Sequence, residues 1–123
     1  LMGIESPKQF ETHPMRGALF ETLIVGEWIK ARWNQGKESN LYFYRDHMGT
    51  EVDGILDGNG GVLPMEIKSA RTFDPGWMRT LERFKELSKE PGRKPLIVYG
   101  GNESQARSGF SLVPWHKAGE SLR

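Results

Sequence analysis

The 123-residue chain contains no cysteine, which excludes disulfide bonds and thiolate metal sites. A metal ion bound here would therefore need oxygen or imidazole ligands. No apolar run approaches the ~20 residues that a membrane-spanning helix needs. The first 14 residues lack the charged-then-apolar layout of a secretory signal. From these absences we expect a cytoplasmic protein with no membrane partner.

Two further features are absent or weak. No GxxxxGK[ST] phosphate loop is present, so this sequence holds no ATP site of the Walker type. The balance of 17 basic and 16 acidic residues gives a net charge of only +1, which is low for a nucleic-acid binder. Positive charge is nevertheless concentrated in one part of the chain. Residues 68–94 carry eight basic and four acidic side chains. That excess suits either phosphate contacts or a solvated helix face with ion pairs.

The length and the hydrophobic pattern predict one α/β domain, after an irregular lead-in and before a loose polar tail that follows Lys117. The expected order is helix, strand, strand, strand, helix, strand, strand, with helices flanking a central mixed sheet. The helices are expected at 15–34 and 74–89, and the strands at 41–46, 51–57, 62–68, 96–99 and 109–113.

The first helix should pack against the sheet, because Phe20, Ile24 and Trp28 recur at helical spacing within a broad apolar arc. Glu21 interrupts this arc. It fits either a solvated edge position or a carboxylate directed along the helix toward a metal site.

Turn chemistry sets the register of the second and third strands. Asn59-Gly60 is a strong signal for a two-residue hairpin turn. Gly58 would then pair with Gly61, and counting back along both strands places Asp53 opposite Glu66. Side chains opposed in this way share one face, with Cβ atoms roughly 4.5–5.5 Å apart.

The other face of this hairpin should belong to the core. There the same register pairs Val52 with Ile67 and Leu56 with Leu63, which is apolar against apolar.

Asp53, Glu66 and the neighbouring Lys68 form a set suited to phosphodiester hydrolysis. Two opposed carboxylates repel each other, and either a raised pKa or a bound cation relieves the repulsion. Mg²⁺ typically uses one or two carboxylates with waters and substrate phosphate, and a lysine beside it can stabilise phosphate charge. The plainer interpretation is a solvated strand face with a Glu–Lys pair.

Three motifs resemble a known family: HPMRGALFE at 13–21, YRDHMGTEVD at 44–53 and MEIKS at 65–69. They look like the domain found C-terminal to AAA-type ATPase modules in a large prokaryotic family. Together with the order of elements, they resemble the PD-(D/E)XK nuclease superfamily, which has the restriction-endonuclease-like fold. The resemblance covers residues 13–117, which leaves the lead-in at 1–12 and the tail at 118–123. The one departure from the short signature is that Val52, not proline, precedes Asp53.

This resemblance implies roles for individual residues. Asp53 and Glu66 would ligate Mg²⁺ (or Mn²⁺), with the Ile67 carbonyl as a further ligand. Lys68 would position or activate the attacking water, and Glu21 would be an outer or second-metal ligand. The implied partners are nucleic acid, with DNA expected, and an upstream AAA-type ATPase module.

Three functions remain open at this point. The first is a metal-dependent nuclease domain that uses Asp53, Glu66 and Lys68. The second is a catalytically weak or inactive nucleic-acid-binding or regulatory module of the same fold. The third is a protein-docking domain with Trp33 or Trp115 as exposed anchors.

Overall fold

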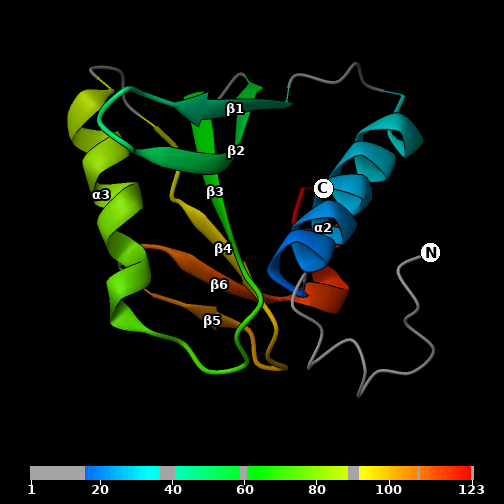
Figure 1. Cartoon of the computed structure of the whole chain (residues 1–123). Coiled ribbons are helices and arrows are strands. Elements are labelled where there is room, and N and C mark those ends of the chain that lie inside the picture. The colour runs from blue at the N-terminus through cyan, green and yellow to red at the C-terminus, as the bar shows by residue number, and fades with distance from the viewer. Residues whose placement is uncertain (1–15, 37–40, 59–60, 89–91, 108, 123) are drawn as a thin grey trace.

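A six-stranded mixed sheet separates two helices in the computed structural model, which describes residues 16–36, 41–58, 61–88, 92–107 and 109–122 (Figure 1). The expected lead-in at 1–12 and the Asn59-Gly60 turn lie outside the described residues. Helix α2 covers one face of the sheet and helix α3 covers the other (Figure 1). The predicted α/β class, with a central mixed sheet and flanking helices, is therefore confirmed.

The strands follow the order β1-β2-β3-β4-β6-β5 across the sheet. Pairing is antiparallel from β1 to β3, parallel from β3 through β4 to β6, and antiparallel between β6 and β5. Only β5 was not expected, because two residues are too few to show a periodic pattern. The strand bounds are β1 Leu41–Arg45, β2 Glu51–Gly58, β3 Gly61–Lys68, β4 Leu96–Tyr99, β5 Gln105–Ala106 and β6 Ser111–Pro114.

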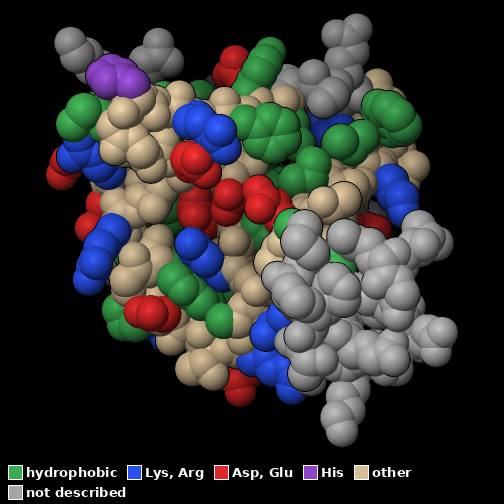
Figure 2. Space-filling model, viewed as in Figure 1, with side chains coloured by type: hydrophobic (Ala, Val, Ile, Leu, Met, Phe, Trp, Pro, Cys, Tyr) green, Lys and Arg blue, Asp and Glu red, His purple; other side chains and the backbone are tan. Residues whose placement is uncertain are grey.

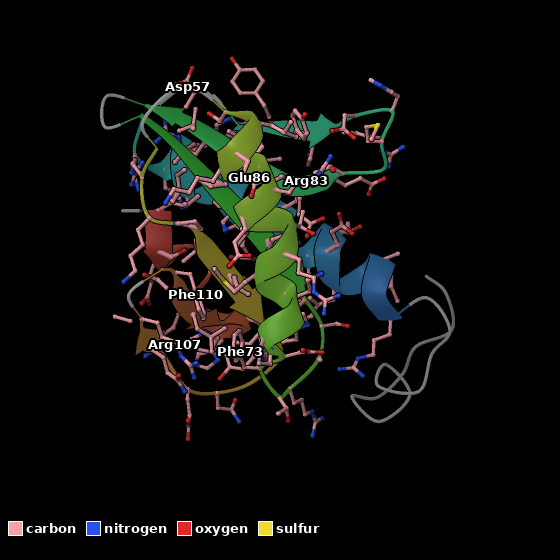
Figure 3. All side chains as sticks on the ribbon, turned by 90° about the vertical axis from the view of Figure 1, so that its left-hand side faces the viewer. Asp57, Phe73, Arg83, Glu86, Arg107 and Phe110 are labelled. Atoms are coloured by element: carbon pink, nitrogen blue, oxygen red, sulfur yellow. The ribbon has the colours of Figure 1, made fainter. Side chains whose placement is uncertain are left out.

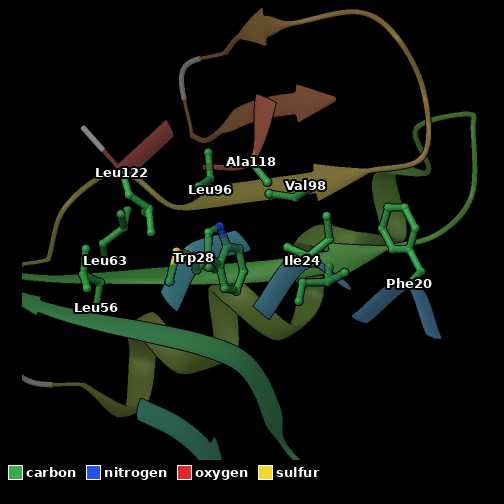
Figure 4. Packing of buried hydrophobic residues seen from close by; sticks show 11 residues of the cluster. Phe20, Ile24, Trp28, Leu56, Leu63, Leu96, Val98, Ala118 and Leu122 are labelled. Carbon is green, nitrogen blue, oxygen red and sulfur yellow. The ribbon is translucent and has the colours of Figure 1, made fainter. Parts of the chain in front are cut away.

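Helix α2 spans Arg16–Asn34 and buries the predicted stripe of Phe20, Ile24 and Trp28. These side chains enter a core with the apolar residues of β3 and β4, such as Met65 and Val98 (Figure 4). The buried part of the broad apolar arc of α2 therefore faces the sheet. No helix in the described ranges is both long enough and apolar enough to cross a membrane.

Helix α3 spans Met78–Leu87 and lies on the opposite face, where it buries Leu81 and Phe84. Asp74 caps the segment that precedes this helix, since its carboxylate accepts the Gly76 N–H at 2.8 Å. The segment it caps is a short 3-10 helix, η1 at Pro75–Trp77, and the α-helix begins directly after it.

The end of the chain differs from the expected loose tail. Two 3-10 helices follow β6, η2 at Trp115–Lys117 and η3 at Glu120–Leu122. Ala118 is 1% exposed and Leu122 is 7% exposed, and both join the core under α2. These two apolar side chains, four residues apart, tie the segment to the domain.

Candidate functional site

Strand β2 contains a β-bulge at the point where the acidic site was predicted. Tyr42 pairs with Ile55 and Tyr44 pairs with Val52, and the register shifts between these pairs. One residue of β1 thus stands opposite two residues of β2, Asp53-Gly54. A bulge of this kind disrupts the ladder locally and redirects a side chain, which is frequent next to active sites.

The bulge reverses the alternation of side chains along β2. Val52 and Ile55 both pack in the cluster of Phe84, on the side of helix α3. Leu56, by contrast, packs on the side of helix α2. The prediction that Val52 shares a core face with Ile67 is therefore wrong, because the extra residue lies between Val52 and the regular part of the strand.

The predicted register of β2 with β3 is confirmed from the Gly58–Gly61 pair to the Gly54–Met65 pair. The ladder ends there, so the expected Asp53–Glu66 backbone pair is not among its register pairs. Two side-chain hydrogen bonds link the strands beyond this point. The Ile67 N–H donates to Asp53 Oδ2 at 2.8 Å, and the Asp53 N–H donates to Glu66 Oε1 at 3.4 Å. The two carboxylates still meet, but through the bulge.

Gly54 leaves room for the floor of this site. A Cβ atom at this position would lie 3.0 Å from Trp28 Cζ3 and 3.2 Å from Met65 Cε, which is closer than ordinary packing allows. An isolated glycine inside a strand is a recognised signal for a bulge or a close approach. Gly54 is therefore the sequence signal that would have predicted the redirected Asp53.

Glu66 is the most buried acidic side chain of the site. The residue is 2% exposed, and its Oε2 lies 3.6 Å from Lys68 Nζ. Burial and the neighbouring Asp53 charge raise the pKa of Glu66 to about 7, although the Lys68 ammonium opposes this rise. Without a bound cation, burial beside Asp53 therefore favours the protonated form of Glu66.

Asp53 and Glu21 complete the cluster. Burial raises the pKa of Asp53, while the Ile67 N–H and the Lys68 charge lower it. Burial, the Asp53 and Glu51 charges and hydrogen bonding with Asp53 raise the pKa of Glu21, although its side chain is exposed on α2. Glu21 is therefore exposed on the helix, as the first interpretation expects, and is also close enough to Asp53 to interact with its carboxylate.

Figure 2 shows acidic side chains gathered at the centre of one face of the molecule, with basic side chains beside them. Carboxylate oxygens are the donors that hard divalent cations prefer, and Mg²⁺ needs only one or two of them. Asp53 and Glu66 provide two carboxylates and so supply the kind and number of donors that Mg²⁺ needs. As the side chains stand, no group of three or more acidic or histidine residues within the described ranges is arranged to hold a metal ion together.

Replacing Glu66 by glutamine should remove a pH-dependent cost to stability in metal-free buffer. The unfolded chain loses the Glu66 proton near its ordinary pKa of 4.5, whereas the folded chain holds it to about 7. The folded state binds more protons between these values, so the contribution of Glu66 to stability falls as pH rises. Between pH 5 and pH 8, we expect the free energy of unfolding of Glu66→Gln to rise by up to about 3 kcal/mol relative to that of the unaltered protein.

Urea unfolding in EDTA at both pH values measures this difference. Glu82→Gln on the exposed side of α3 is the matched control and should show no such change. If the difference in unfolding free energy between Glu66→Gln and the unaltered protein stays constant or shrinks with rising pH, the pKa of Glu66 is not raised in the folded state.

Fold and site together define a small α/β domain with a carboxylate–lysine cluster at a strand bulge. The chain belongs to the family described as a domain of unknown function, DUF4143, whose model matches residues 16–118. No curated protein and no solved structure matches the chain significantly.

Proposed function

We propose that this domain hydrolyses phosphodiester bonds in nucleic acid with a divalent cation, Mg²⁺ or Mn²⁺. The observation that carries the proposal is the convergence of Asp53, Glu66 and Lys68 beside the bulge. Burying carboxylates without full compensation costs stability, and here it raises the pKa of both acids. Such strain is typical of sites whose charge is completed by a ligand.

Each residue has a distinct part in this proposal. Asp53 and Glu66 would hold the cation, with the Ile67 carbonyl and Glu21 as further oxygen donors at its edge. The cation would supply neutralisation of phosphate charge and activation of a water. Lys68 Nζ, beside Glu66, would orient that water and stabilise the charge that develops on the phosphate. The Ile67 N–H fixes the Asp53 carboxylate in place.

The proposal also includes the resemblance to PD-(D/E)XK nucleases. The sheet supports it because β4 lies parallel beside β3, which carries Glu66 and Lys68, after an antiparallel meander. We further propose that the natural protein joins this domain to an upstream AAA-type ATPase module, in keeping with the motifs at 13–21 and 44–53.

A second candidate function is a nucleic-acid-binding or regulatory module that does not cleave. One observation favours it: in the described part of the chain, the acidic side chains do not form a three-donor group as they stand. A weak cation site would leave binding without turnover.

A cleavage assay separates the two candidates. Supercoiled plasmid and a labelled single-stranded oligonucleotide are incubated with the chain in Mg²⁺, in Mn²⁺ or in EDTA. We expect cleavage with either cation, none in EDTA, and a loss of at least about 100-fold with Asp53→Asn. Asp57→Asn, an exposed change on the same strand, is the control and should cleave normally. Absence of cleavage with both cations, or equal cleavage by Asp53→Asn, would refute the nuclease proposal.

A further inference from the structure

A cleft of about 990 Å³ opens at the carboxyl ends of β3, β4 and β6, next to the acidic cluster. It extends over the segments that follow β3 and β4, and its far wall comes from the start of α2. The crevice outside the carboxyl ends of parallel strands is the usual place for ligands in α/β sheets.

The floor of this cleft is a close backbone contact between the two loops. The Gly100 N–H donates to the Ala70 carbonyl at 2.9 Å. A Cβ atom at Gly100 would lie 2.3 Å from the Ser69 oxygen, and one at Gly101 would lie 2.6 Å from the Arg71 oxygen. Only glycine permits this approach, so the cleft is built into the backbone of the fold.

The lining of the cleft is basic, unlike the chain as a whole. Among the described residues of its lining, Arg16, Arg71 and Arg107 come from three separate segments, against one acidic residue, Glu103. The whole chain has a net charge of only +1. Positive charge is thus concentrated where a polyanion could enter.

Neighbouring groups hold the Arg16 and Arg107 guanidinium groups in position. The Arg16 guanidinium donates to the Ser69 carbonyl at 2.5 Å, which uses one of its five N–H donors. The Arg107 guanidinium lies 4.7 Å from the centre of the Phe73 ring and donates twice to Gln105 Oε1. Phe73, Phe110 and Arg107 lie together near β5, away from Arg83 on α3 (Figure 3).

Aromatic surfaces complete the lining. Trp115 is 41% exposed at the start of η2, and Phe73 is half-buried beneath Arg107. Arginine planes and aromatic rings are the surfaces on which unpaired bases stack. A duplex keeps its bases stacked on each other and offers phosphates but no base faces.

The segments that line the cleft adjoin those of the carboxylate cluster along the chain. Lys68 of the cluster directly precedes Ser69 of the cleft, and Phe20 of the cleft directly precedes Glu21 of the cluster. We infer that the cleft binds a single strand of nucleic acid, whose phosphates contact the arginines and whose bases stack on Trp115 and the Arg107 platform. Its role as substrate rests on the proposed hydrolysis.

Binding without cations tests this inference separately from cleavage. The unaltered chain is titrated in EDTA against a fluorescent single-stranded oligonucleotide, a duplex of the same length and a phosphoserine peptide of matched charge. We expect the single strand to bind at least about tenfold tighter than either competitor, since base stacking adds to phosphate contact. Trp115→Ala should weaken single-strand binding about tenfold. Arg107→Gln should weaken it several-fold and reduce the slope of log affinity against log salt by about 0.7.

Arg83→Gln is the matched control, because it removes the same charge from the exposed face of α3 and should leave single-strand affinity unchanged. Equal affinity for the duplex or the peptide would overturn the inference. So would a loss with Arg83→Gln as large as that with Arg107→Gln, because binding would then follow surface charge alone. Circular dichroism of each variant confirms the fold. Cleft-dependent binding without any cleavage would support this inference and refute only the nuclease proposal.

Discussion

Replacing Lys68 by methionine is expected to slow phosphodiester cleavage about 100- to 1000-fold while leaving cation binding intact or strengthened. Lys68 Nζ lies 3.6 Å from Glu66 Oε2, and its side chain is 33% exposed. The ammonium therefore faces both the carboxylates and the open side where a phosphate would arrive. In the proposed hydrolysis, removing it would take away a positive charge that competes with the cation but assists the reaction.

Lys30→Met provides the control for this result. Lys30 also pairs with a glutamate, at 3.5 Å from Glu27 Oε1, but its side chain is 71% exposed on α2. Cleavage by that variant should equal cleavage by the unaltered chain. Single-turnover cleavage rates, with Mn²⁺ affinity measured by calorimetry, separate the two effects. Normal cleavage by Lys68→Met, or loss of Mn²⁺ binding, would contradict the role assigned to Lys68.

Replacing Trp28 by alanine is expected to destabilise the domain by about 3–5 kcal/mol. Trp28 is fully buried and is one of the largest side chains in the core. It also lies against Gly54 at the bulge, where a Cβ atom would come within 3.0 Å of its ring. Truncation would therefore leave a large cavity directly beneath the strand that carries Asp53. A loss of this size is a major part of the stability of a typical domain.

Trp33→Ala is the matched control on the same helix. Trp33 is 68% exposed, so its loss should change stability by no more than about 0.5 kcal/mol. Urea unfolding followed by circular dichroism measures both variants. Similar midpoints for the two would contradict the placement of Trp28 in the core. Trp28→Phe should cost less than Trp28→Ala, because no described residue accepts a hydrogen bond from the indole N–H.

The parts of the fold that depend on local pattern could be predicted from the sequence. Phe20, Ile24 and Trp28 recur at helical spacing, and Asn59-Gly60 indicated a register that holds from Gly58–Gly61 to Gly54–Met65. Each of these signals acts over a few neighbouring residues, where geometry is nearly fixed by residue type.

The bulge and the cleft could not be predicted in the same way. The bulge becomes visible only when β2 is compared with β1, through the pairs Tyr42–Ile55 and Tyr44–Val52. The cleft joins Arg16, Arg71 and Arg107, which come from distant segments and share no motif. Such features arise from tertiary packing, which a periodic pattern does not encode.

The extra residue in β2 also makes the acidic site sensitive to insertions and deletions in the gene. Loss of one codon at Asp53-Gly54 would restore strict alternation and turn Val52 away from Phe84, so core and carboxylate would change in the same step. Point substitutions can adjust the acids one at a time, but an insertion or deletion here acts on the whole site. Within the family, conservation of strand length at this position should therefore follow conservation of the acidic residues themselves.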